Sequence, residues 1–123
     1  MKINTLLLSM LTIGILNSCE KAENETPQPY ESGVIVVNAG NFSDNNGSLS
    51  LLQRTGNTLV TDIFLKENLR SLTGSLSGYC EVNGKGVILV DNSTAGKDVV
   101  EIVDAGTFKS IATIPSTEIE NPR

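Results

Sequence analysis

Two phrases in the sequence are nearly identical, and their repetition constrains the fold more than any other feature. "GVIVVNAG" occupies residues 33 to 40 and "GVILVDNS" occupies residues 86 to 93, so the phrase recurs 53 residues later. Two further runs recur at a distance of 51 residues, because "LSLL" (49 to 52) aligns with "VEIV" (100 to 103) and "VTDI" (60 to 63) aligns with "IATI" (111 to 114). Three short apolar runs therefore recur in the same order.

These runs have the composition of β-strands separated by turns. Val, Ile, Leu and Thr dominate the runs, and Gly, Asn, Asp and Ser lie between them. No stretch beyond the N-terminal leader favours a helix with comparable strength. We predict strands at 33–39, 47–54, 58–65, 75–82, 86–92, 98–105 and 109–115.

A repeat of about 50 residues with four short antiparallel strands is typical of a β-propeller blade, because one such sheet cannot bury both of its apolar faces alone. The first repeat, about residues 33–70, begins at its second strand, whereas the second repeat, about 75–120, supplies all four. The sequence therefore predicts an all-β fold in which residues 33–123 form about two four-stranded antiparallel blades of an incomplete propeller ring. The alternative is an ordinary β-sandwich whose strands resemble one another only in composition.

The N-terminus has the pattern of a signal peptide over residues 1–18. Its apolar run, residues 6–16, has about half the roughly 20 residues that a membrane-spanning helix needs. The residues Leu16-Asn17-Ser18 directly before Cys19 resemble the lipobox of bacterial lipoproteins. That resemblance implies that Cys19 carries diacylglycerol and becomes the mature N-terminus, attached to the membrane through its lipid. The alternative is an N-terminal core helix that contains a buried cysteine.

Residues 19–32, which begin with the lipidated cysteine, are polar and acidic and contain two prolines, as expected for a flexible tether. Glu20, Glu23 and Glu25 resemble the acidic signal that sends lipoproteins of Bacteroides-type bacteria to the outer face of the outer membrane. The simpler alternative is that any exposed linker is acidic. We therefore expect a lipid-anchored protein of the outer membrane, exposed at the cell surface.

Charge and composition exclude several classes of function. Nine Lys and Arg residues face fourteen Asp and Glu residues, for a net charge of −5, so nucleic acid is not expected as a partner. The sequence contains no histidine, which excludes Ser-His-Asp triads, Cys-His dyads and metal sites built on imidazole. We assign no catalytic residue, no metal ligand and no cofactor.

Individual polar residues give only weak signals. Cys80 lies in an apolar run and is expected to be a small buried residue. "SDNNGS" (43 to 48) lacks the ligand spacing of a calcium loop and is expected to be a turn. Asn24, Asn41, Asn46 and Asn92 begin N-x-Ser/Thr triplets that are expected to mark loops.

Three carboxylates could be imagined as an acid and base pair, namely Asp62, Glu101 and Asp104. Asp62 and Glu101 occupy different positions in the two repeats and alternate with apolar residues. We therefore expect these carboxylates to lie on solvated faces or in turns rather than in an active site.

The folded part also resembles a known family. "GVIVVNAGNFSDNNGSLSLL", followed by "VVEIVDAGTFKSIATI" and "NPR", is similar to the start of the YVTN-type β-propeller surface lipoproteins of Bacteroides-type bacteria. The most specific positions are Gly33, Asn38, Gly40, Asn41, Phe42, Gly47, Ser48, Leu49, Ser50, Val103, Asp104, Thr107, Phe108, Pro122 and Arg123.

The resemblance implies a binding module that captures a small nutrient, of the corrinoid or glycan class, beside an outer-membrane transporter. Two alternatives remain open: a truncated propeller enzyme of the lactonase or quinoprotein dehydrogenase type, and a non-functional gene fragment. The end of the chain near the start of a third blade favours a fragment of a longer propeller, and a small oligomerising sheet protein is the alternative.

Overall fold

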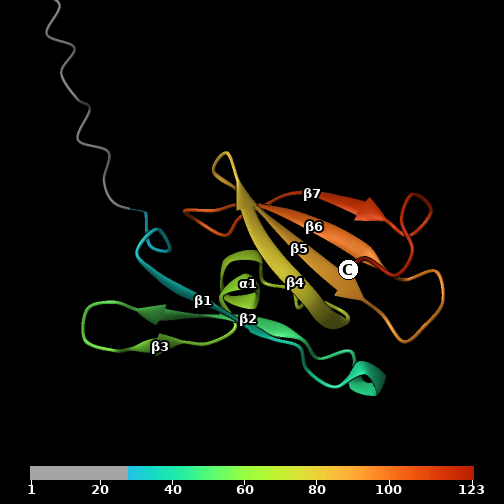
Figure 1. Ribbon diagram of the computed structural model, residues 1–123, viewed down its shortest axis with the longest axis horizontal. Coiled ribbons are helices and arrows are strands. Elements are labelled where there is room, and N and C mark those ends of the chain that lie inside the picture. The colour runs from blue at the N-terminus through green and yellow to red at the C-terminus, as the bar shows by residue number, and fades with distance from the viewer. Residues whose placement is uncertain (1–27) are drawn as a thin grey trace, which may run out of the picture.

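The fold consists of two antiparallel sheets joined by a short helix (Figure 1), and the computed structural model describes residues 28–123. The first sheet has the order β1 (Gly33–Asn38), β2 (Ser48–Gln53) and β3 (Leu59–Val60). The second has the order β4 (Ser75–Val82), β5 (Lys85–Asp91), β6 (Val99–Asp104) and β7 (Ser110–Pro115). The predicted all-β fold class is confirmed. The leader, Cys19 and most of the tether lie outside the described residues.

The strand predicted at 58–65 is wrong over most of its length. Only Leu59–Val60 pairs with β2, and the chain then forms helix α1 (Ile63–Asn68). Asp62 caps the start of the helix: its backbone lies in the left-handed region (φ 46°), and its carboxylate accepts a hydrogen bond from the Leu65 amide at 3.4 Å. Ile63 and Phe64 are fully buried, so tertiary burial of these two apolar side chains favours a short helix over an extended run.

The core lies between the two sheets and includes α1. β2 contributes Leu49 and Leu51, and β5 contributes Ile88 and Val90. α1 lies against β2, between the two sheets in Figure 1. The buried apolar cluster comprises Tyr30, Leu49, Leu51, Ile63, Phe64, Leu72, Leu76, Ile88, Val90, Val103 and Phe108. Within the described part of the chain, no helix is long and apolar enough to cross a membrane.

Tyr30 joins this core although it lies in the range predicted as a tether. Its amide donates to the carbonyl of Gly106 at 3.0 Å, and its ring meets that of Phe108 edge-on at 5.2 Å between centroids. The Tyr30 hydroxyl donates to Glu67 Oε1 at 2.6 Å. The segment before β1 is therefore held against both α1 and the β6–β7 turn.

Strand register corrects the alignment of the two repeats by one residue. In the first sheet Gly33 pairs with Gln53. The residue 51 positions after Gln53 is Asp104, and in the second sheet Asp104 pairs with Lys85. Gly33 therefore corresponds in the sheets to Lys85, not to Gly86 as the similar phrases predict. Successive side chains of a strand point to opposite faces. If β5 is aligned with β1 by the similar phrases, every residue of β5 is therefore matched to the wrong face.

Candidate functional site

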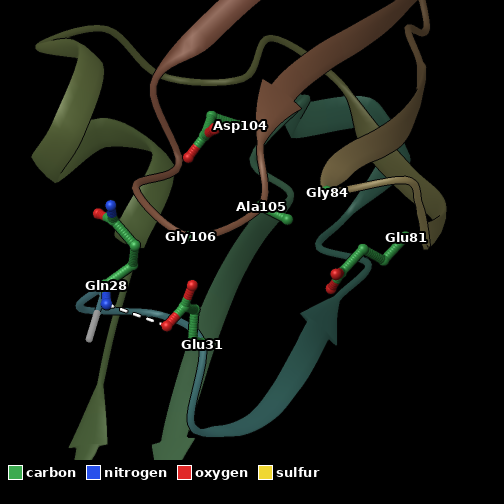
Figure 2. A pocket seen from close by; sticks show the side chains of 7 residues that line it. All are labelled: Gln28, Glu31, Glu81, Gly84, Asp104, Ala105 and Gly106. Carbon is green, nitrogen blue, oxygen red and sulfur yellow. Dashed lines mark hydrogen bonds between the residues drawn. The ribbon is translucent and has the colours of Figure 1, made fainter. Parts of the chain in front are cut away.

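Two pockets in the part of the chain that we describe are considered as candidate sites, and Figure 2 shows the smaller of the two. It has a volume of about 310 Å³ and lies beside the β4–β5 turn, the β6–β7 turn and the segment before β1. Figure 2 shows Glu31 and Gln28 on one side of the pocket and Glu81 on the other, with Asp104 at its upper end. The lining residues are Gln28, Glu31, Glu81, Gly84, Asp104, Ala105 and Gly106.

Two tight connections shape this pocket. Asn83 (φ 50°) and Gly84 (φ 71°) form a two-residue turn between the paired residues Val82 and Lys85, and both have the positive φ that such hairpin turns require. The Ala105 amide donates to the Gly84 carbonyl at 2.9 Å, which joins this turn to the β6–β7 connection. The rim of the pocket is therefore made of backbone that is fixed by hydrogen bonds.

The electrostatics of the smaller pocket are those of an acidic surface, since Glu31, Glu81 and Asp104 line it and no Lys or Arg does. Asp104 accepts hydrogen bonds from the Thr107 hydroxyl and amide, each at 2.8 Å, and the hydroxyl contributes most to lowering the pKa of this carboxyl. Burial, with a further contribution from Glu81, raises the pKa of Tyr79 to about 12. The pocket therefore disfavours anions.

The larger pocket has a volume of about 700 Å³ and is formed by loops that belong to both sheets. They are the β1–β2 loop, the segment before β4, the β5–β6 loop and the end of β7. The lining is mostly polar and comprises Asp44, Asn45, Thr73, Asn92, Thr94, Gly96, Lys97, Asp98, Val99, Pro115 and Ser116. This mixture of amides, hydroxyls, carboxylates and one amine can donate and accept hydrogen bonds to an uncharged polar ligand.

A reciprocal pair of hydrogen bonds holds the two sides of the larger pocket together. The side-chain amide of Asn45 donates to Ser93 Oγ at 2.8 Å, and the Ser93 amide donates to Asn45 Oδ1 at 2.8 Å. Asn45 can face Ser93 because its backbone is left-handed (φ 51°) at the end of the 3₁₀ turn η1 (Phe42–Asp44). These bonds connect the β1–β2 loop of the first sheet to the β5–β6 loop of the second.

Asp98 stabilises the wall of the larger pocket. It is buried, and its carboxylate accepts from the Asn92 amide at 2.8 Å and from the Asn121 amide at 2.9 Å. Asn92 in turn accepts from the Thr94 amide at 2.8 Å and donates to the Thr73 carbonyl. The pocket wall is therefore a connected polar network, which gives it a defined shape.

Glu101 contradicts the expectation of a solvated carboxylate, because its side chain is only 1% exposed. β6 points it into the space between the sheets, where it accepts hydrogen bonds from Arg70 Nη2 at 2.5 Å, from Thr113 Oγ1 at 2.9 Å and from Ser110 Oγ. The Arg70 guanidinium also lies 4.8 Å from the centre of the Phe64 ring. Burial of an ionised carboxylate requires such partners, so Glu101 has a structural role here.

The two cysteines and the two remaining carboxylates differ in how well their predicted surroundings agree with the structure. Cys19 lies outside the described residues, and Cys80 is exposed, so the expectation that it is buried is wrong. Cys80 lies on β4, one of the two edge strands of its sheet, beside which no further strand pairs among residues 28–123. Asp104, the last residue of β6, makes the turn contacts that were expected, whereas Asp62 caps α1, which the sequence did not predict.

The asparagines of the N-x-Ser/Thr triplets that fall within the description lie in loops, as expected. Asn41 accepts from the Ser43 amide at 2.9 Å, and the side chain of Asn46 accepts from the Asn41 amide at 2.7 Å. "SDNNGS" (43 to 48) is a turn, as expected, and begins within η1. Sequence reasoning missed Asn45 and Ser93 as a pair, because nothing in the sequence indicates that residues 48 positions apart meet.

No protein-family model matches this chain, and none of the curated proteins is significantly similar to it. The geometry of the pockets is therefore the main guide to function.

Proposed function

We propose that this chain is a surface lipoprotein, attached to the outer membrane through lipid on Cys19, and that its folded part is a β-propeller-type module that binds a small nutrient. The support for the propeller is the recurring order of strands, since β1, β2 and β3 correspond to β5, β6 and β7. In this arrangement β4 is the innermost strand of one blade, and the first blade has no counterpart of it among the described residues. The nutrient would pass to an outer-membrane transporter.

The single observation that carries the binding proposal is the larger pocket, where the Asn45–Ser93 pair joins loops of the two sheets. Its volume falls in the range of small-molecule sites, and loops of both sheets contribute to it. Because most of its lining residues carry side chains that can form hydrogen bonds, a glycan, which presents many hydroxyl groups, fits this pocket better than a corrinoid does. We therefore assign the ligand to the glycan class.

Binding accounts for these residues better than catalysis does. The most buried carboxylate, Glu101, already accepts hydrogen bonds from Arg70, Ser110 and Thr113, so it has no free role as a general base. The carboxylate of Asp98 is likewise engaged by two backbone amides. We therefore propose a binding module rather than a lactonase or dehydrogenase.

The experiment is calorimetric titration of the purified full-length chain with a panel of oligosaccharides and with cyanocobalamin. We expect binding of one oligosaccharide class with a Kd of about 1 mM, because two sheets supply only part of a propeller site. Asn45→Gly should abolish this binding, since glycine keeps the left-handed backbone while removing the amide.

The matched control is Asn57→Gly. Asn57 has a similar backbone conformation (φ 49°) in the β2–β3 turn and does not line the larger pocket. This variant should bind like the wild type. Tight binding of cyanocobalamin, or oligosaccharide binding that survives Asn45→Gly, would contradict the proposed ligand class and site.

A further inference from the structure

Both sheets carry apolar residues on the face that points away from the core. On the first sheet, Val34 lies opposite Leu52 and Leu52 lies opposite Leu59, and these side chains are 53%, 38% and 53% exposed. Val36 lies on the same face, two residues from Val34. We call the surface formed by Val34, Val36, Leu52 and Leu59 face one.

The second sheet has a corresponding outer surface. Val103 belongs to the core and Glu101 points toward it, so the residues that alternate with them, Val100 and Ile102, lie on the opposite face of the sheet, where Val100 is 8% exposed among its neighbours. Strand pairing places Leu89 and Ile114 beside Val100, and Val87 and Ala112 beside Ile102. We call the surface formed by Val87, Leu89, Val100, Ile102, Ala112 and Ile114 face two.

The corrected register shows that these two faces repeat the interface already present inside the chain. At the corrected register Ile35 corresponds to Val87, while Leu49 and Leu51 correspond to Val100 and Ile102. Ile35, Leu49 and Leu51 form the side of the first sheet that packs into the core, so face two repeats that side.

Face one repeats the opposite side of the same interface. Val36 corresponds to Ile88, and Leu52 corresponds to Val103. Ile88 and Val103 are the fully buried residues that the second sheet presents to the core. Each chain therefore carries both halves of a sheet-on-sheet interface, one half on each of its outer faces.

We propose that copies of this chain associate head to tail, with face two of one copy on face one of the next. Such an interface joins different surfaces of identical chains and closes into a ring when the rotation per copy permits. The occupant is a second copy because face one and face two continue the interface observed within the chain. This inference does not depend on the proposed ligand.

The size of the faces favours a ring over an open pair. The smaller surface, face one, belongs to strands of six, six and two residues. These strands cover roughly 220 Å² at about 3.3 Å per residue and about 4.8 Å between strands. One contact therefore buries about 440 Å² in total, below the roughly 1,200 Å² at which stable interfaces begin. In a ring each copy uses both faces, so no apolar face stays in water and the contacts reinforce one another.

The test compares the masses of full-length variants, purified in a mild detergent, by light scattering or sedimentation. Leu52→Glu blocks face one and Ile102→Glu blocks face two. Each variant alone should be a single chain, whereas the wild type should have the mass of several chains. An equimolar mixture of the two variants should form pairs only at high protein concentration, because one variant supplies an intact face two and the other an intact face one, but a single contact is small.

The mixture distinguishes this arrangement from a symmetric pair, in which one of the two single variants would still associate. Leu69→Glu is the control, because Leu69 is apolar and 90% exposed yet lies on neither face, and this variant should associate like the wild type. Circular dichroism confirms that each variant is folded. A wild type that remains a single chain, or variants that keep the wild-type mass, would overturn the proposal.

Discussion

The carboxylate of Glu101 lies 2.5 Å from the guanidinium of Arg70, and this contact joins the second sheet to the segment that follows α1. Glu101 is almost completely buried, whereas the side chain of Arg70 is about half exposed. The pair therefore brings one charge out of water while the other stays partly solvated. Its stability depends on the partners that Glu101 retains inside the protein.

Replacement of Arg70 by alanine should lower the free energy of unfolding by about 2 kcal/mol. Removing one partner of a fully buried pair costs about 3–5 kcal/mol, but water can reach Glu101 through the space that Arg70 vacates. The matched control is Lys109→Ala. Lys109 Nζ lies 3.7 Å from the carboxylate of Glu67 on the surface, so this variant should lower the free energy of unfolding by less than about 1 kcal/mol. Urea denaturation measures both, and equal losses would show that Glu101 does not depend on Arg70.

The hydrogen bonds from Thr107 should make Asp104 a source of pH-dependent stability. They lower the pKa of Asp104 in the folded chain, so the stabilisation is complete above the unfolded value of about 3.9 and is lost as pH falls through the lower folded value. Thr107→Val should cost about 1 kcal/mol at pH 7 and less under acidic conditions. Thr55→Val, in the exposed β2–β3 turn, should change stability little at either pH, and a Thr107→Val deficit that does not change with pH would refute this account.

Replacement by alanine should have very different effects on stability at Gly74, directly before β4, and at Gly78, within β4. A Cβ at Gly74 would lie 2.5 Å from Val90 Cγ1 and 2.8 Å from the Asp91 carbonyl oxygen, so Gly74→Ala should destabilise the chain by about 1–3 kcal/mol. A Cβ at Gly78 would meet only Leu89 Cδ1 at 3.7 Å, an ordinary contact. Gly78→Ala should therefore be neutral or slightly stabilising. Thermal unfolding followed by circular dichroism compares the two, and similar melting temperatures would contradict the close packing at Gly74.

The proposed lipid anchor predicts that the wild type incorporates labelled palmitate and partitions into detergent. Cys19→Ala should abolish both, because acyl burial contributes about 0.8 kcal/mol per CH₂ and the attachment requires the thiol. Cys80→Ala is the matched control and should keep both properties, since Cys80 lies within the folded part. A wild type that stays in the aqueous phase would rule out the lipobox interpretation.

Much of the fold could be predicted from local sequence pattern. Six of the seven predicted strands form close to their expected positions, because runs of Val, Ile and Leu between Gly, Asn and Asp favour extended structure wherever they pack. The turn nature of "SDNNGS" and of the segment after Asp104 also follows from local chemistry, since Asn and Asp tolerate left-handed backbone and cap nearby amides.

The candidate site could be predicted only in outline. Its loops are marked by Asn, Ser and Asp, but the meeting of Asn45 with Ser93 depends on how the two sheets pack. The helix at Ile63–Asn68 is a similar case, because a short apolar run suits a strand or a helical turn equally well. Burial of Ile63 and Phe64 against the core decides between them.

The sequence by itself determined that two similar sets of strands follow one another, because side-chain branching and turn residues act over a few neighbouring positions. Only the tertiary structure decided their register and facing. The phrases beginning at Gly33 and Gly86 match by residue type, yet hydrogen bonding to β2 and β6 places Gly33 in correspondence with Lys85. The same packing turned Glu101 toward the core, where Arg70 neutralises it. Hydrogen bonds between strands depend on backbone geometry rather than side-chain identity, so a shift of one residue leaves no trace in the sequence and still exchanges the buried face for the exposed one.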